Sequence, residues 1–181
     1  MSESNITKNA LAASMKKLMR SRPFEKISVS DICSDCGINR KSFYYHFRDK
    51  YDLVNWIFYT EFIGSMDLSG YRTGWDWLND MGEYFYKERE FYRCALKIEG
   101  QNSFKDYLVE VISPIAAFFL QDVFPETEKD NFYITFMLDA LLTSTVRWLS
   151  GGYSMEMNAE EFVERIREVI IRLGRSAWTG K

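Results

Sequence analysis

The sequence of 181 residues has no run of 18 or more consecutive apolar residues, so it offers no candidate for a membrane-spanning helix. Its first stretch, MSESNITKNALAASMKKLMRSRPF, carries polar and basic side chains where a secretory signal needs an apolar core. Only three cysteines occur, an odd number that is too small for a disulfide scaffold and fits a reducing compartment. We therefore expect a soluble protein of the cytoplasm with no membrane partner.

Features that carry catalysis or hold a cofactor are also scarce. His46 is the single histidine, no glycine-rich phosphate loop is present, and no nucleophile has an evident base beside it. Cys33 and Cys36 have the spacing of a redox motif or of half a zinc site, but only Cys94 and His46 remain as further ligands. Buried cysteines on the apolar face of a helix are the simpler interpretation. We predict no enzymatic activity, no cofactor and no metal.

Apolar and aromatic residues, in contrast, are plentiful. They make up 46% and 17% of the chain, which is more than a disordered protein carries. Charge is unevenly divided, because residues 1–50 hold ten Lys or Arg against five Asp or Glu, and the rest hold thirteen against twenty-one. A basic head on an acidic body suggests that the head binds a polyanion.

Apolar periodicity predicts helices along the whole chain, and no strand signal of comparable strength appears. The expected helices cover residues 6–22, 29–36, 40–47, 50–66, 74–97 with a division near Lys87, 103–124 with a kink or break at Pro114, 128–152 and 158–175. The predicted fold is therefore all-α. It is divided into a basic head over residues 1–50 and an acidic helical body over residues 51–181.

Capping residues place two short helices in succession within the head. Ser28 with Asp31 has the spacing of a capping box, Gly37 supplies a stop, and Asn39 can cap the next helix. Two short helices joined by a turn that contains glycine form the helix-turn-helix pattern.

The helix after this turn has an unusual face. Phe43 and Phe47 share one side with Ile38 and can seal the helix onto its neighbours. The remaining side chains are rich in hydrogen-bond donors and aromatic rings: Arg40, Lys41, Ser42, Tyr44, Tyr45 and His46. Such side chains can meet phosphates and base edges, although a polar outer face of a small bundle would also explain them.

This stretch resembles the TetR family of transcriptional regulators, over residues 6–58 and centred on ISVSDICSDCGINRKSFYYHFRDKYDL. The matching features are Ser28, the Gly37-Ile38 turn, the run from Ser42 to Phe47, and Lys50. Within the family, PFEKISVSDI and DKYDLVNWIF look like the branch that includes regulators of dihydroxyacetone kinase operons.

The resemblance implies that the third helix lies in the major groove of double-stranded DNA. By matching positions, Arg40, Lys41, Ser42, Tyr44 and Tyr45 contact bases or nearby phosphates, while Ser28, His46 and Lys50 hold the DNA backbone. Position 41 is often glycine in the family, which leaves open whether Lys41 reads a base or meets a phosphate. The implied function is a homodimeric repressor at a palindromic operator, with a transcriptional activator or an adaptor for a partner protein as alternatives.

Dimerisation is expected because one small reading head contacts too few base pairs for a unique genomic site. The candidate interface lies on the last two long helices: Phe132, Phe136, Asp139, Leu142, Val146, Arg147 and Leu149. These apolar residues can equally belong to the core. For Asp139, we weigh an ion pair with Arg147 of the second subunit first, a ligand anchor second, and simple solvent exposure third.

Aromatic residues of the body form a candidate effector pocket, as family members commonly hold a small molecule there. The candidate lining is Trp56, Phe62, Trp77, Tyr84, Phe85, Phe91 and Phe118. An aromatic helical core has the same sequence pattern. A body that docks a co-regulator protein instead of a metabolite is the remaining alternative.

Overall fold

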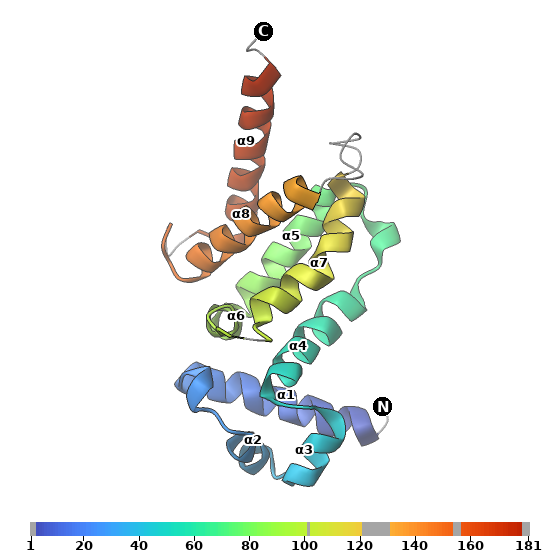
Figure 1. Ribbon diagram of the computed structural model, residues 1–181, viewed down its shortest axis with the longest axis vertical. Helices are drawn as coiled ribbons and strands as arrows, with labels where there is room; N and C mark the ends of the chain where they lie inside the picture. Colours follow the sequence, from blue (N-terminus) through green and yellow to red (C-terminus); the bar gives the residue numbers. More distant parts are fainter. Residues whose placement is uncertain (1–2, 101, 121–130, 154–156, 179–181) are drawn as a thin grey trace. The chain divides into compact units, whose positions relative to one another are not determined.

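The computed structural model describes residues 3–100, 102–120, 131–153 and 157–178, and all regular structure in these ranges is helical (Figure 1). The α-helices are α1 (Glu3–Ser21), α2 (Val29–Cys36), α3 (Arg40–His46), α4 (Lys50–Glu61), α5 (Gly74–Lys87), α6 (Arg89–Ala95), α7 (Phe104–Leu120), α8 (Asn131–Leu149) and α9 (Ala159–Trp178). Three short 3-10 helices are η1 (Phe24–Lys26), η2 (Ile63–Ser65) and η3 (Leu68–Gly70). The predicted all-α fold is confirmed, as is the division of the 74–97 segment near Lys87.

The chain forms two compact units. The first contains residues 1–66 and 90–112, and the second contains residues 67–89 and 113–181. The units are defined by which residues pack together, and they differ from the predicted domains. The first unit contains the expected head together with all of α4, most of α6 and part of α7. The functional division into residues 1–50 and 51–181 stays a prediction.

The short helices of the first unit begin and end where capping chemistry places them. The Ser28 hydroxyl accepts from the backbone N–H of Asp31, and the Asp31 carboxylate accepts from the N–H of Ser28, which completes a capping box at α2. Gly37 ends α2 with φ 70°, a left-handed conformation that glycine adopts without strain. The Asn39 side chain accepts from Ser42 N–H at 2.8 Å and starts α3.

Apolar side chains from α1 to α4 fill the core of the first unit. Its fully buried members include Leu11, Met15, Ile32, Phe43, Leu53 and Ile57. A second group of rings joins α4 to later helices, since Phe58 contacts Tyr92 and Phe104 edge-on, with centroids 6.2 and 5.6 Å apart.

The second unit is built on the packing of α5 against α9. Gly82 on α5 is buried, and a Cβ added there would lie 3.1 Å from the Val163 side chain, so a larger residue would push the two helices apart. Trp148 on α8 stacks on Phe162 of α9 with ring centroids 4.2 Å apart and planes 8° from parallel. Its indole N–H donates to Met157 O at 2.9 Å, which satisfies the one polar atom of a buried ring.

Two helix predictions differ from the structure. The fourth helix ends at Glu61 rather than at residue 66, because the Ser65 hydroxyl bonds the carbonyls of Glu61 and Phe62 and the chain tightens into η2. Pro114 does not break α7. It is exposed, where backbone groups freed by a proline can bond water. The predicted helix ends at 121–124 and 128–130 lie outside the described residues.

None of the helices in the described ranges has the length and apolar character needed to cross a membrane.

Candidate nucleic-acid interface

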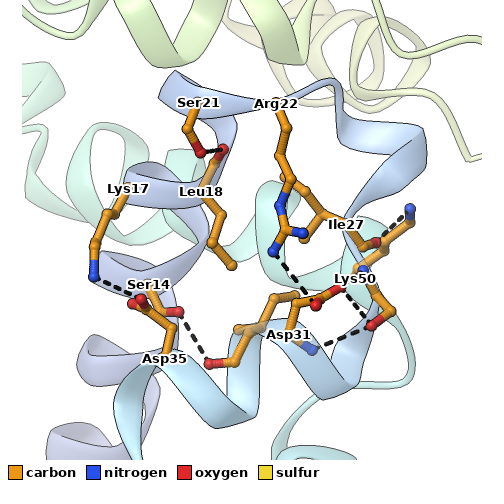
Figure 2. Close-up of polar contacts among 11 residues, drawn as sticks. Ser14, Lys17, Leu18, Ser21, Arg22, Ile27, Asp31, Asp35 and Lys50 are labelled. Carbon is orange, nitrogen blue, oxygen red and sulfur yellow. Dashed lines mark hydrogen bonds and ion pairs between the residues drawn. The ribbon is translucent and has the colours of Figure 1, made fainter.

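Polar contacts hold α1 against α2 and so support the helix pair α2–α3 (Figure 2). The buried Ser14 hydroxyl donates to Ile32 O at 3.0 Å. Lys17 and Asp35 pair at 2.6 Å on the exposed side of the same contact, and the Lys17 ammonium is the largest cause of a lowered pKa of Asp35. The exposed ion pair stabilises little by itself, so the apolar contact and the buried hydroxyl carry most of the attachment.

Two phenylalanines anchor α3 to the rest of the unit. Phe43 and Phe47 are buried, and Phe47 lies edge-on against Trp56 of α4 with centroids 5.5 Å apart. With Asn39 capping one end, both the position and the rotation of this seven-residue helix are set. The predicted sealing role of these two rings is confirmed.

The opposite face of α3 is open to solvent. Arg40 and Lys41 are exposed, and Tyr44 and Tyr45 retain 50% and 84% of their surface. The Arg40 guanidinium lies over the Tyr44 ring at 5.9 Å, and Tyr45 meets the His46 ring edge-on at 4.9 Å. These side chains form a surface of cations and aromatic rings that can contact a polyanion.

The other two predicted contacts on α3 are less accessible. Ser42 and His46 are half-buried, and the backbone N–H of Ser42 is occupied by the Asn39 cap. The predicted contacts on α3 therefore differ in exposure. The exposed side chains, called the outer set below, are Arg40, Lys41, Tyr44 and Tyr45.

Ser28 is exposed, but its polar groups are committed within the protein. Its hydroxyl donates to Asp31 Oδ2 at 2.6 Å and its backbone N–H donates to the same oxygen at 2.8 Å. These two bonds, with the Arg22 guanidinium 3.4 Å from the other carboxylate oxygen, hold the pKa of Asp31 below its ordinary value. A phosphate at Ser28 would have to compete with this carboxylate.

Lys50 is committed within the protein as well. Its ammonium donates to the carbonyls of Phe24 and Ile27, each at 2.8 Å, and to Glu25 O at 3.4 Å. Burial lowers the pKa of this half-buried group, an effect that the nearby Glu25 carboxylate opposes. In this arrangement the ammonium is engaged by two carbonyls at 2.8 Å and one at 3.4 Å, so a phosphate would have to compete with them, and the predicted phosphate contact by Lys50 stays a prediction.

Two cations beside the motif were missed by sequence reasoning. Lys26 in η1 is exposed, and the Arg48 side chain, directly after α3, keeps 73% of its surface while lying 3.5 Å from Asp49. The sequence pattern that could have pointed to them is the excess of Lys and Arg in residues 1–50. This excess does not distinguish a cation exposed to solvent from one that bonds within the protein.

The cysteine pair lies on the inner side of α2. Cys33 is buried, which raises the pKa of its thiol, and the Cys36 Sγ donates to Ile32 O at 3.2 Å. Among the described residues, no group of three or more His, Cys, Asp or Glu side chains could hold a metal ion. The pair packs as small apolar side chains do.

The residues predicted to form the dimer interface all lie on α8, and they differ in how exposed they are in the single chain. Phe132 and Phe136 keep 66% and 60% of their surface and stack on each other, and Asp139 and Arg147 are exposed in the single chain. Leu142 and Val146 are half-buried. Leu149 is buried in the single chain, as is its neighbour Trp148, and its predicted place in the interface stays a prediction.

The seven predicted pocket residues do not share one environment. Trp56, Phe62 and Phe91 belong to the first unit, and each contacts a protein ring or cation: Phe47 and Lys8 at Trp56, Phe58 at Phe62, and Lys16 and Tyr92 at Phe91. Trp77, Tyr84 and Phe85 belong to the second unit, where Trp77 and Phe85 are buried. Phe118 is 61% exposed, unlike the wall of an enclosed cavity. Phe62 and Phe91 are buried in the core of the first unit, whereas Trp56 is half-buried, and their predicted place in a pocket stays a prediction.

The chain is similar to known regulators over most of its length. It is 26% identical over 174 residues to the HTH-type dhaKLM operon transcriptional activator DhaS of Lactococcus lactis subsp. lactis (strain IL1403), covering 95% of this chain and 83% of that protein. A solved structure of the dihydroxyacetone kinase operon activator DhaS superposes with a TM-score of 0.67 at 23% identity, covering 93% and 96% of the two chains. Native NalD, the secondary repressor of the MexAB-OprM multidrug efflux pump in Pseudomonas aeruginosa, shares the fold with a TM-score of 0.60 at 14% identity, covering 94% and 96%.

Two family models account for both parts of the chain. The model for bacterial regulatory proteins of the tetR family matches residues 11–57, the region that contains the helix-turn-helix. The model for a transcriptional regulator C-terminal region matches residues 75–172, which is more than half of the sequence. The chain therefore belongs to the TetR family of DNA-binding transcriptional regulators.

Proposed function

We propose that the chain acts as a homodimer that reads a palindromic operator through the outer side chains of α3. The observation that carries this proposal is the solvent-facing set Arg40, Lys41, Tyr44 and Tyr45 on a helix fixed by Asn39 and by two buried phenylalanines. Arginine pairs well with guanine edges, and tyrosine can meet a phosphate oxygen or a thymine methyl group. Lys41 has room to reach either a base or a phosphate.

The dimer would form through α8 and α9. Support comes from the stacked and exposed Phe132 and Phe136, which lie one turn apart on a face that also exposes Asp139. Large exposed rings in a contiguous position favour association. Two-fold symmetry would then place two α3 helices in successive major grooves, about 34 Å apart.

The body, residues 51–181, would receive the regulatory signal, either a small molecule or a co-regulator protein. The buried Trp77 and Phe85 are the predicted pocket residues that best suit an apolar ligand, because they lie inside the second unit. No catalytic role is part of this proposal, since TetR-family proteins generally act by binding. A protein that binds operator DNA would act in the cytoplasm, and we propose this location for the chain.

Repression is the first candidate for the sign of regulation, and activation of a dihydroxyacetone kinase operon is the second. The second is favoured by one observation, the similarity to an activator of such an operon across 95% of this chain. Deleting the gene distinguishes them: transcription of the adjoining target rises after loss of a repressor and falls after loss of an activator.

The central test is selection of bound fragments from the source genome by the purified protein. A variant with Lys41, Ser42 and Tyr44 changed to Ala is the comparison. Enrichment of one palindrome by the natural protein, lost in the variant, is the expected result. Absence of any enriched sequence at low salt would overturn direct DNA reading and favour an adaptor that needs a partner protein.

A further inference from the structure

The ammonium group of Lys50 occupies a site made of backbone carbonyls. Its Nζ atom lies 2.8 Å from Phe24 O, 2.8 Å from Ile27 O and 3.4 Å from Glu25 O. It also lies 4.2 Å from the centroid of the Phe24 ring, a cation–π distance. Figure 2 shows the Lys50 side chain directed toward the segment that holds Ile27.

The segment that Lys50 bonds is anchored by the buried side chains of Phe24 and Ile27, but it has few backbone hydrogen bonds of its own. Residues 24–27 contain only the short 3-10 helix η1 and the extended residue Ile27, which leaves most of their carbonyls without helical partners. Within the segment, Ile27 N–H donates to Phe24 O at 3.0 Å and Lys26 N–H donates to Pro23 O at 3.0 Å. Lys50 donates three further hydrogen bonds to a turn that has two backbone hydrogen bonds.

The contact of Lys50 with Phe24 and Ile27 links the start of α4 to the residues just before α2. Ile27 immediately precedes Ser28, which caps α2, and Lys50 is the first residue of α4. The helix-turn-helix pair α2–α3 is the chain between these two points. A single side chain therefore holds together both ends of the segment that carries the reading helix.

We propose that Lys50 is a positioning residue for DNA reading, which sets α2 and α3 relative to α4, and that it does not bind a DNA phosphate. The inference rests on the proposed function, in which α3 reads the operator. Transfer of the ammonium to a phosphate would remove the donor that the Ile27 carbonyl has in Lys50, would leave Phe24 O with only the Ile27 N–H, and would take the cation away from the Phe24 ring.

The salt dependence of operator affinity separates positioning from phosphate binding. Each lysine–phosphate contact contributes about 0.9 to the slope of log K against log salt, so loss of one contact per subunit lowers the slope of a dimer by about 1.8. For Lys50→Met we expect affinity to fall by about tenfold or more, as for loss of a charged hydrogen bond, with the slope unchanged. Lys50→Arg should lose affinity too, because a planar guanidinium cannot meet the three carbonyls as the ammonium does.

The opposite pattern would overturn the inference: a slope lower by about 1.8 in Lys50→Met, with affinity and slope restored in Lys50→Arg. Affinity of the natural protein for the selected operator is the internal reference. If the natural protein binds no sequence, the proposed function has failed, whereas normal binding with a changed slope in Lys50→Met is a failure of the positioning role alone.

A second measurement on the natural protein covers the case in which Lys50→Met does not fold. Three acceptors should slow proton exchange of the Lys50 ammonium, so its ¹⁵N signal should be visible in the free protein. Its chemical shift should stay the same when operator is added. A Lys50 signal that appears only with operator would mean that a phosphate orders the group and would overturn the inference.

Discussion

The Arg40 guanidinium carbon lies 5.9 Å from the centroid of the Tyr44 ring, one turn further along α3. The pair stands at the start of α3, the helix that we propose reads DNA, and recognition helices contact base edges through their first residues. The ring restricts the flexible arginine on an otherwise exposed surface. The Tyr44 ring and its hydroxyl can therefore have separate effects on DNA binding.

Replacing Tyr44 with Leu should weaken discrimination at the base pair that we propose Arg40 to read. An exposed cation–π contact contributes about 0.5–1 kcal/mol, so discrimination should fall by roughly two- to fivefold. Tyr44→Phe keeps the ring and should retain discrimination, even if total affinity falls through loss of the hydroxyl. Binding to operators with single base-pair changes measures both effects. Equal loss of discrimination in the two variants would assign the effect to the hydroxyl group.

Removing the Asn39 cap should destabilise the first unit by about 1 kcal/mol, because the Ser42 N–H loses its acceptor. Thermal unfolding of Asn39→Ala measures this, and Asn39→Ser should recover most of the loss. Asn39→Asp should retain stability while weakening DNA binding, because it adds a negative charge at the start of the reading helix. An Asn39→Ala protein as stable as the natural one would contradict the capping role.

Introducing a charge at Phe136 should separate the subunits. Phe136 is 60% exposed in the single chain, so Phe136→Glu should leave the helical fold intact. Two symmetric copies would each lose roughly 1.5–3 kcal/mol of apolar burial, which weakens association by about a hundredfold or more. Sedimentation and operator binding measure the result. Asn79→Glu, which adds the same charge at an exposed position of α5, is the matched control. A dimeric Phe136→Glu that still binds operator would exclude this face of α8 as the interface.

Stability should fall in acid partly through Asp31. Bonds from Ser28 lower the pKa of this carboxyl below its ordinary value of 3.8 in the folded chain. The charged form is therefore favoured by folding, so the contribution is complete above pH 3.8 and disappears as the pH falls through the folded pKa. Ser28→Ala should show a smaller decrease in melting temperature between about pH 5 and pH 3. Ser30→Ala, on the same helix and outside the capping box, should behave like the natural protein.

The sequence by itself determined the features that depend on neighbouring residues. Ser28, Asp31, Gly37 and Asn39 act within three or four positions of their partners, so the boundaries of α2 and α3 could be predicted from spacing alone. The rotation of α3, with Phe43 inward, followed from the helical period. These local features also carried the resemblance to the TetR family.

Tertiary structure decided what each polar or aromatic side chain contacts. Lys50 bonds carbonyls 23 to 26 residues earlier, and Trp56 lies edge-on against Phe47. Leu149 is buried although Phe136, on the same helix, is exposed. A lysine that reaches a phosphate and a lysine that supports a turn have the same spacing in sequence. Only packing between distant segments determines which acceptors lie within reach of an ammonium group, and which side of an apolar helix remains open to a partner.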